Sequence, residues 1–260
     1  MQNAASYMNG LSLHYYTVPK TWQEKGSATE FDNDLYLETL KKAYFMEELV
    51  TKHSAIMDRY DPERRVGLIV DEWGCWFDVE PGTNPGFLYQ QNTMRDAMVA
   101  AMTLNIFNSH CERVRMANIA QTVNVLQAIL LTEGDKLVLT PTYHVFDLYQ
   151  PHMDAQLADC QVDSALLPNG VSQLSASASR KDGALTITVA NFDKQTDVQL
   201  RGFDASTFEA RALIGDPQRH NTFDAPETVK PQAFSGVKLV PDGADVAMPA
   251  HSILALTFRG

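Results

Sequence analysis

The spacing of apolar residues divides the chain into two parts. Up to about residue 150, short continuous apolar runs alternate with longer segments in which apolar residues recur every three to five positions. Continuous runs are typical of strands covered on both faces, and the longer spacing is typical of amphipathic helices. Beyond about residue 152 the spacing changes to alternation of apolar and polar positions, as in half-buried antiparallel strands. The pattern therefore predicts an α/β part followed by an all-β part.

The first part has the strand, helix, strand, helix, strand order of a parallel sheet. Asp34 is expected to cap the first helix, and Asp61-Pro62 is expected to end it. The run after that helix finishes in two carboxylates, so polar chemistry is expected where the strand stops. The predicted elements are strands at 11–16, 65–74 and 114–120, helices at 34–60, 89–110 and near 143–149, and a helix or loop at 121–131.

The second part predicts an antiparallel sandwich. Leu185, Ile187 and Val189 alternate with threonines, and Asp182-Gly183 just before them is a tight-turn signal. Further strand-like runs at the spacing of a sandwich lie between clusters of Gly, Pro and Asp. We expect a partial (β/α)8 barrel domain, its last strands only, at residues 1–150 and a β-sandwich domain at residues 151–260. The further predicted strands are 197–203, 207–214, 236–240 and 252–258.

Composition excludes several partners. The 260 residues carry a net charge of −11, which disfavours nucleic acid and acidic membrane surfaces as partners. No apolar run reaches the roughly 20 residues that a membrane helix needs. The odd number of cysteines, 3, fits thiols in a reducing compartment. We expect a cytoplasmic protein, on condition that no further N-terminal segment carries an export signal.

Candidate chemistry lies at the predicted strand ends. In a parallel α/β barrel reactive side chains project from the C-terminal ends of strands, which fits residues 14–16, 71–74 and 118–121. A glutamate there, followed by tryptophans, suits a sugar-cleaving site, because a carboxylate can attack an anomeric carbon while an indole packs on the sugar ring. Glu72 is therefore the candidate catalytic carboxylate. On pattern alone, two carboxylates that merely solvate a strand end are an equal alternative.

The sequence indicates no other kind of catalytic site. The seven histidines show no pairing at metal-ligand spacing such as HExxH, so no metal site is predicted. No glycine-rich phosphate loop occurs. Cys75 lies next to the candidate site, but no neighbour in the sequence would activate its thiol, and a small buried residue is expected there.

Three segments, in order, resemble α-L-arabinofuranosidases of glycoside hydrolase family 51. They are LSLHYYTVP at 11–19, VGLIVDEWGCW at 66–76, and the run RVRMANIAQ to DLYQPH at 113–152. A looser match continues to PAHSILALTF at 249–258. The resemblance implies a TIM barrel with a jelly-roll-like sandwich and a retaining mechanism without a cofactor. It also implies release of terminal non-reducing α-L-arabinofuranosyl residues from arabinan, arabinoxylan or their oligosaccharides.

The resemblance assigns roles to residues on the first two predicted strands. Glu72 takes the place of the catalytic nucleophile. Tyr16 matches the tyrosine whose hydroxyl bonds that nucleophile, and His14 matches the histidine two positions earlier. Such hydrogen bonds would hold the carboxylate in its attacking rotamer and keep it ionised. For His14, simple packing in the barrel is the alternative.

Four further positions follow from the same resemblance. Trp76 matches an aromatic wall beside the sugar, with a plain core tryptophan as the alternative. Gln121 matches a glutamine that hydrogen-bonds the furanose, and Asn118 is a weaker neighbour. Gly74 stands where many relatives have asparagine, so that side-chain contact is missing here.

One half of the expected site has no counterpart in the chain. A retaining glycosidase uses two carboxyl groups about 5 Å apart. The resemblance places the acid/base glutamate in an Asn-Glu pair on an earlier barrel strand, and no Asn-Glu pair occurs here. We therefore expect the chain to be the C-terminal portion of a longer, homo-oligomeric enzyme and to have little activity alone.

Two other functions stay open. One is a different retaining glycosidase of the same barrel clan, acting on β-xylosides or β-glucans. The other is a non-catalytic carbohydrate-binding or assembly subunit, whose residual half-site another chain completes.

Overall fold

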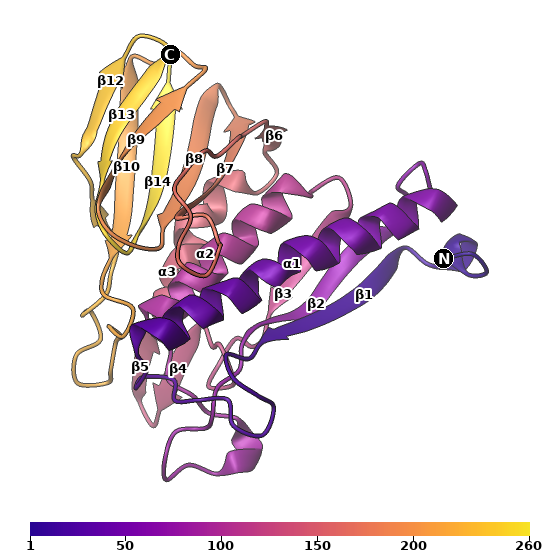
Figure 1. Ribbon diagram of the computed structural model, residues 1–260, viewed down its shortest axis with the longest axis vertical. Coiled ribbons are helices and arrows are strands. Elements are labelled where there is room, and N and C mark those ends of the chain that lie inside the picture. Colours follow the sequence, from indigo (N-terminus) through magenta and orange to yellow (C-terminus); the bar gives the residue numbers. More distant parts are fainter.

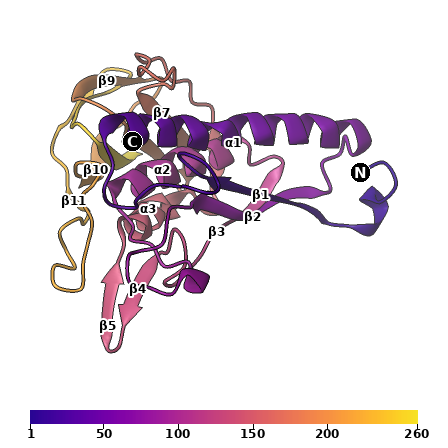
Figure 2. The same cartoon turned by 60° about the horizontal axis from the view of Figure 1, so that its bottom comes forward.

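A three-stranded parallel sheet forms the framework of the first part. In the computed structural model, which describes residues 1–260, its order is β1-β2-β3. Two helices follow β1 and β2, pack against each other and lie on the same side of the sheet (Figures 1 and 2). The elements are β1 (Gly10–Thr17), α1 (Asn33–Tyr60), β2 (Gly67–Cys75), α2 (Met94–Ser109) and β3 (Val114–Ile119).

The helix starts differ from the sequence expectation. Asp32, not Asp34, caps α1, because its side chain accepts a hydrogen bond from the Leu35 amide, and Asp34 lies in the first turn. The second helix begins at Met94 rather than near residue 89. A capping box between Thr93 and Asp96 fixes that start. The spacing of apolar residues alone does not show at which residue the loop ends and the capped helix begins.

A hairpin follows β3 where the sequence predicted a helix or loop at 121–131. Its strands are β4 (Leu130–Glu133) and β5 (Lys136–Leu139), joined by a turn through Gly134. Residues 121–129 form the loop that leads into it. The short helix α3 (Pro141–Tyr149) then begins with the Thr140 side chain as its cap.

The second part is an antiparallel β-sandwich. A six-stranded sheet has the order β11-β10-β14-β8-β7-β6, and a three-stranded sheet has the order β12-β13-β9 (Figure 1). The predicted turn at Asp182-Gly183 joins β7 to β8. The strands are β6 (Gln156–Ala158), β7 (Leu174–Lys181), β8 (Ala184–Asn191), β9 (Thr196–Arg201), β10 (Thr207–Ile214), β11 (Gln232–Ala233), β12 (Val237–Val240), β13 (Gly243–Met248) and β14 (Ser252–Arg259). The predicted fold class, an α/β part followed by an antiparallel sandwich, is confirmed.

The two parts share one core. The largest buried apolar cluster joins the sheet and its helices to sandwich residues such as Phe192 and Ile253. Within this contact the Asn105 side-chain oxygen of α2 accepts hydrogen bonds from Ser177 at 2.8 Å and from Thr188 at 3.0 Å. Because buried polar networks of this kind specify one packing, the sandwich fixes α2 in place. No helix of the chain has both the length and the apolarity needed to cross a membrane.

Candidate active site

The register of β1 and β2 brings the predicted residues together. His14 lies beside Glu72 and Tyr16 beside Gly74, while Leu13 pairs with Val70, so β2 contains one extra residue at this point. The same extra residue appears in the pairing of β2 with β3. Such a bulge re-aims the side chains around it. The sequence predicted that Asp71 and Glu72 lie where the strand ends. In the structure the strand continues to Cys75, so both carboxylates lie within it.

Tyr16 and Glu72 are joined directly. The Tyr16 hydroxyl donates a hydrogen bond of 2.5 Å to Oε2 of Glu72. Burial raises the pKa of Tyr16, and the bond to the Glu72 carboxylate and its negative charge raise it further. The phenol therefore stays protonated and acts as the donor. This bond fixes one oxygen of the carboxylate and leaves Oε1 without a partner in the chain.

His14 approaches both carboxylates of the bulge. Its Nδ1 atom lies 3.7 Å from Oε2 of Glu72, and its Nε2 atom lies 4.0 Å from Oδ2 of Asp71. The side chains of His14 and Glu72 are 49% and 42% exposed. Both side chains are therefore accessible from solvent.

Trp76 forms an aromatic wall beside the pair. Its ring meets Tyr16 edge-on at 5.0 Å and Trp22 edge-on at 5.6 Å between centroids. The Lys25 ammonium lies 5.7 Å from the centre of the Trp76 ring. Trp22, which is 58% exposed, was not predicted from the sequence. The available signal was a tryptophan in the proline-containing loop directly after the HYY strand.

Gln121 and Tyr16 line different cavities. Gln121 is the second residue after β3, and the Ala120 amide between them donates a 2.9 Å hydrogen bond to the Trp73 carbonyl of β2. The Gln121 side chain makes no hydrogen bond within the chain and lines a neighbouring cavity. Asn118 is exposed on β3.

A buried glutamine explains Gly74. Gly74 has φ +134°, and a Cβ atom there would lie 3.1 Å from Oε1 of Gln127. That oxygen accepts a 2.7 Å hydrogen bond from the Cys75 amide, while Nε2 of Gln127 donates to the carbonyl of Asp96 and the hydroxyl of Thr142. Gln127 therefore joins the end of β2 to α2 and α3. Sequence reasoning missed it, because this contact spans 52 positions.

The site contains no second activated group. Cys75 is fully buried, and burial raises the pKa of its thiol well above the usual range. No group of three or more His, Cys, Asp or Glu side chains is placed to hold a metal ion. The arrangement offers one positioned carboxylate with an aromatic wall. That combination suits attack on the anomeric carbon of a sugar.

Comparison with known proteins identifies a family. The family model described as the alpha-L-arabinofuranosidase C-terminal domain matches residues 71–252. An intracellular exo-alpha-L-arabinofuranosidase of Bacteroides ovatus is 42% identical over 100% of this chain and 52% of its own length. An intracellular exo-alpha-(1->5)-L-arabinofuranosidase of Streptomyces lividans is 23% identical over 88% of this chain and 36% of its own length. The chain thus spans about half the length of the first of these curated relatives.

A solved structure agrees with this match. The GH51 arabinofuranosidase from Xanthomonas axonopodis pv. citri superposes with a TM-score of 0.93 at 46% identity, covering 98% of this chain and 54% of that one. The arabinofuranosidase from Thermotoga maritima, solved as an arabinose complex, shares the fold, with a TM-score of 0.77 at 22% identity over 98% of this chain and 54% of that one. The family predicted from the three sequence segments is confirmed, and this chain belongs to the α-L-arabinofuranosidases of glycoside hydrolase family 51.

Proposed function

We propose that the chain carries the nucleophile side of a retaining α-L-arabinofuranosidase site, with Glu72 as the nucleophile. The observation that supports this most directly is the 2.5 Å hydrogen bond from Tyr16 to Glu72 between adjacent parallel strands. The proposed substrates are arabinan- or arabinoxylan-type oligosaccharides, from which the enzyme removes terminal non-reducing α-L-arabinofuranosyl residues.

The first step is attack by the free oxygen of Glu72. With Oε2 held by Tyr16, Oε1 forms a bond to the anomeric carbon as the glycosidic C–O bond breaks. The leaving oxygen takes a proton from a general acid, and a glycosyl ester of Glu72 results. Water, deprotonated by the same group, then attacks the anomeric carbon, which releases arabinose and restores the carboxylate.

The general acid is proposed to come from outside these 260 residues. In a retaining site it lies about 5 to 5.5 Å from the nucleophile, across the bond that is cleaved. Asp71, the adjacent carboxylate in the sequence, precedes Glu72 on the same strand and faces His14. A barrel segment beyond this chain would supply the acid, which agrees with the chain spanning about half of the Bacteroides ovatus relative.

Trp76 and Gln121 are proposed to contact the substrate. The Trp76 indole offers an apolar face to the arabinose bound at Glu72. Gln121, with a free amide at the end of β3, offers hydrogen bonds to sugar hydroxyls. We also propose that the enzyme is a homo-oligomer and that it is cytoplasmic. The cytoplasmic location fits the names of its relatives, which describe them as intracellular.

The test combines this chain with the missing catalytic half. The chain is fused to, or co-expressed with, an N-terminal barrel segment of a family relative that contains an Asn-Glu strand, and hydrolysis of an aryl α-L-arabinofuranoside is measured. Activity is expected only from the combination. The Glu72→Ala variant should be inactive, and added azide should restore turnover and give the glycosyl azide of inverted configuration.

Other outcomes would reject the assignment. Hydrolysis that survives Glu72→Ala, or azide that changes nothing in an otherwise folded variant, excludes Glu72 as the nucleophile. Preference for aryl β-xylosides or β-glucosides would favour another retaining glycosidase. Sugar binding without turnover in the combined protein would favour a binding subunit.

A further inference from the structure

The loop between β1 and α1, residues 18–32, carries two side chains that meet the Trp76 ring. Trp22 packs edge-on against that ring, and the Lys25 ammonium lies over it. The same ammonium donates a 2.7 Å hydrogen bond to the Trp22 carbonyl, so the two contacts are linked. The loop contains no helix or strand. Its position, and with it the setting of Trp76, therefore depends on contacts with the rest of the chain.

A buried arginine makes several of these contacts. Arg95 lies in the first turn of α2 and is fully buried. Its guanidinium packs against two phenyl rings, with the central carbon 3.7 Å from the ring centre of Phe31 in the loop and 3.8 Å from that of Phe77 after β2. One terminal nitrogen donates hydrogen bonds of 3.1 Å to the carbonyls of Ser27 and Ala28. Arg95 thus joins the loop to the end of β2 and to α2.

The chemistry of this contact is specific to arginine. A guanidinium is planar, so it can lie against ring faces while its edge donates to carbonyl oxygens, which a lysine ammonium cannot do. The Nε atom and the second terminal nitrogen of Arg95 are buried without a partner in the chain. Burying such groups costs free energy, and an apolar side chain of similar length would fill the space without that cost. The arrangement therefore favours a positional role for Arg95 over a purely stabilising one.

Two further anchors act on the same loop. The Asp78 carboxylate accepts hydrogen bonds from two consecutive loop amides, residues 25–26, at 3.2 and 2.9 Å. From the sandwich, Gln218 donates a 2.8 Å hydrogen bond to the Phe31 carbonyl. Asp78 and Gln218 are exposed, whereas Arg95 is fully buried. Because water does not compete for buried interactions, Arg95 is the strongest of the three anchors.

We propose that Arg95 is a positioning residue of the active site, which acts through the loop of Trp22 on the Trp76 wall. Held in this way, the loop keeps the Trp76 indole at the angle at which its face meets arabinose bound at Glu72. The inference rests on the proposed function, because that function makes Trp76 a substrate contact. The affinity for the sugar, rather than the attack by Glu72, should therefore depend on Arg95.

Fluorine NMR tests the positional link without any activity. The 260-residue chain contains three tryptophans, so labelling with fluorotryptophan gives three signals. In Arg95→Met the signals of Trp22 and Trp76 should shift, because the loop is no longer held. The signal of Trp73, which is buried against Phe107, should stay where it is and shows that the fold persists.

Kinetics of the combined enzyme tests the functional link. Arg95→Met should raise KM for an aryl arabinofuranoside roughly tenfold and change kcat by less than about twofold, because a misplaced wall weakens ground-state and transition-state binding alike. A variant that is merely less stable loses active enzyme, which lowers kcat and leaves KM unchanged. Met102→Ala, at a buried position further along α2, provides that comparison. Adding Trp22→Ala to Arg95→Met should raise KM no further, since both changes remove the same contact.

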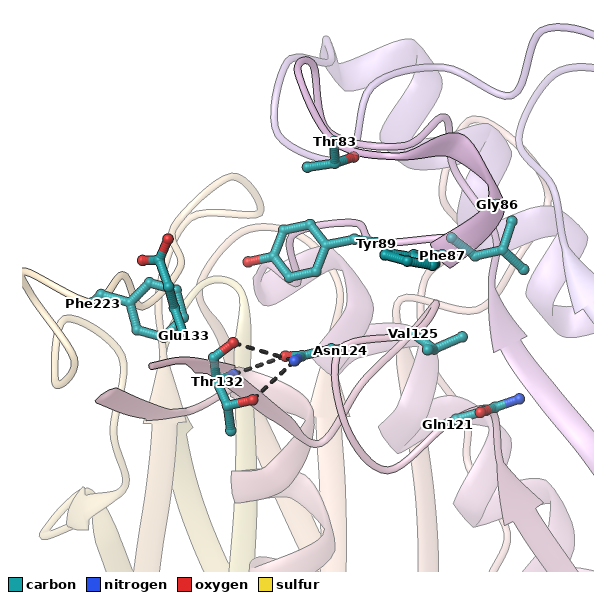
Figure 3. A pocket seen from close by; sticks show the side chains of 11 residues that line it. Thr83, Gly86, Phe87, Tyr89, Gln121, Asn124, Val125, Thr132, Glu133 and Phe223 are labelled. Atoms are coloured by element: carbon teal, nitrogen blue, oxygen red, sulfur yellow. Dashed lines mark hydrogen bonds between the residues drawn. The ribbon is translucent and has the colours of Figure 1, made fainter. Parts of the chain in front are cut away.

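Phe87→Ala is the matched control for the NMR experiment. Phe87 lies in the same segment between β2 and α2 as Phe77, and its side chain is 68% exposed. Its ring lines a separate cavity together with Tyr89 and Phe223 (Figure 3). Its removal should therefore leave all three tryptophan signals in place.

A second variant keeps the test decisive if Arg95→Met does not fold. Phe31→Leu removes one of the two rings while the buried charge and its hydrogen bonds remain, so the same signals should move and KM should rise roughly two- to threefold. Unchanged Trp22 and Trp76 signals, or an unchanged KM, in the folded variants overturns the proposal. Failure of azide rescue at Glu72, with KM still dependent on Arg95, would overturn only the nucleophile role.

Discussion

The Tyr16 hydroxyl donates to the Glu72 carboxylate from the neighbouring strand, and a bulge in β2 makes this bond possible. In the pairing of β1 with β2, Leu13 lies opposite Val70 and His14 opposite Glu72, so one residue of β2 is skipped. Without that extra residue Glu72 would shift along the strand relative to Tyr16. The local irregularity thus aims the carboxylate.

Tyr16→Phe should lower kcat of the combined enzyme by roughly 10- to 100-fold with little change in KM, because a hydrogen bond to a charged group contributes about 1.5–3 kcal/mol. The matched control is Tyr15→Phe. The Tyr15 hydroxyl bonds the Lys42 carbonyl of α1 rather than the carboxylate, so turnover should be unchanged. Steady-state kinetics on an aryl arabinofuranoside measures both. Equal losses in the two variants would argue against a positioning role for Tyr16.

Gly74→Ala should destabilise the chain by about 2 to 4 kcal/mol, since it combines a strained φ with contact against a buried side chain. The backbone has φ +134° and the new Cβ would meet Gln127. Gly82→Ala is the control, because Gly82 has φ +84° but nothing within 4 Å of a Cβ atom. Comparing the urea unfolding of the two variants separates the cost of the positive φ from the cost of the contact with Gln127. Equal losses would mean that the Gln127 contact relaxes without cost.

Gln127→Met removes the amide at nearly constant volume and should cost about 2 kcal/mol, because it leaves the buried Cys75 amide without an acceptor. Gln199→Met in the exposed part of β9 is the control and should change stability by less than about 0.5 kcal/mol. Denaturant midpoints measure both. If the Gln127 variant is as stable as the control, this amide does not fasten the end of β2.

The residues predictable from the sequence are those whose signal is local. The continuity of their apolar runs identified β1 and β2, although only β2 is largely buried. Glu72 was found by its place in the second run. The sequence did not predict the roles of Trp22, Gln127 and Phe223, because these roles come from contacts between residues distant in the sequence. The Phe223 loop, for example, is held to the hairpin by Asn221, 82 positions from its partner Leu139. Local periodicity does not encode such pairings.

The burial of His152 should make the folded chain less stable in acid. It lies after α3, where its Nδ1 atom is 2.7 Å from the Ser179 hydroxyl and its Nε2 atom is 3.0 Å from that of Thr188. Burial lowers the pKa of His152 from 6.5 to about 4. Between these values the unfolded chain binds a proton at this histidine and the folded chain does not. Acidification in this window therefore favours unfolding.

Roughly 3 kcal/mol of the free energy of unfolding should be lost through His152 as the pH falls from 7 to below 4, at about 1.4 kcal/mol for each unit by which the pKa differs. His152→Gln keeps a polar side chain of similar size but cannot take up the proton. Urea unfolding at several pH values between 7 and 4 should therefore show a shallower loss of stability in the variant. Parallel pH profiles for the two proteins would show that other groups carry the acid sensitivity.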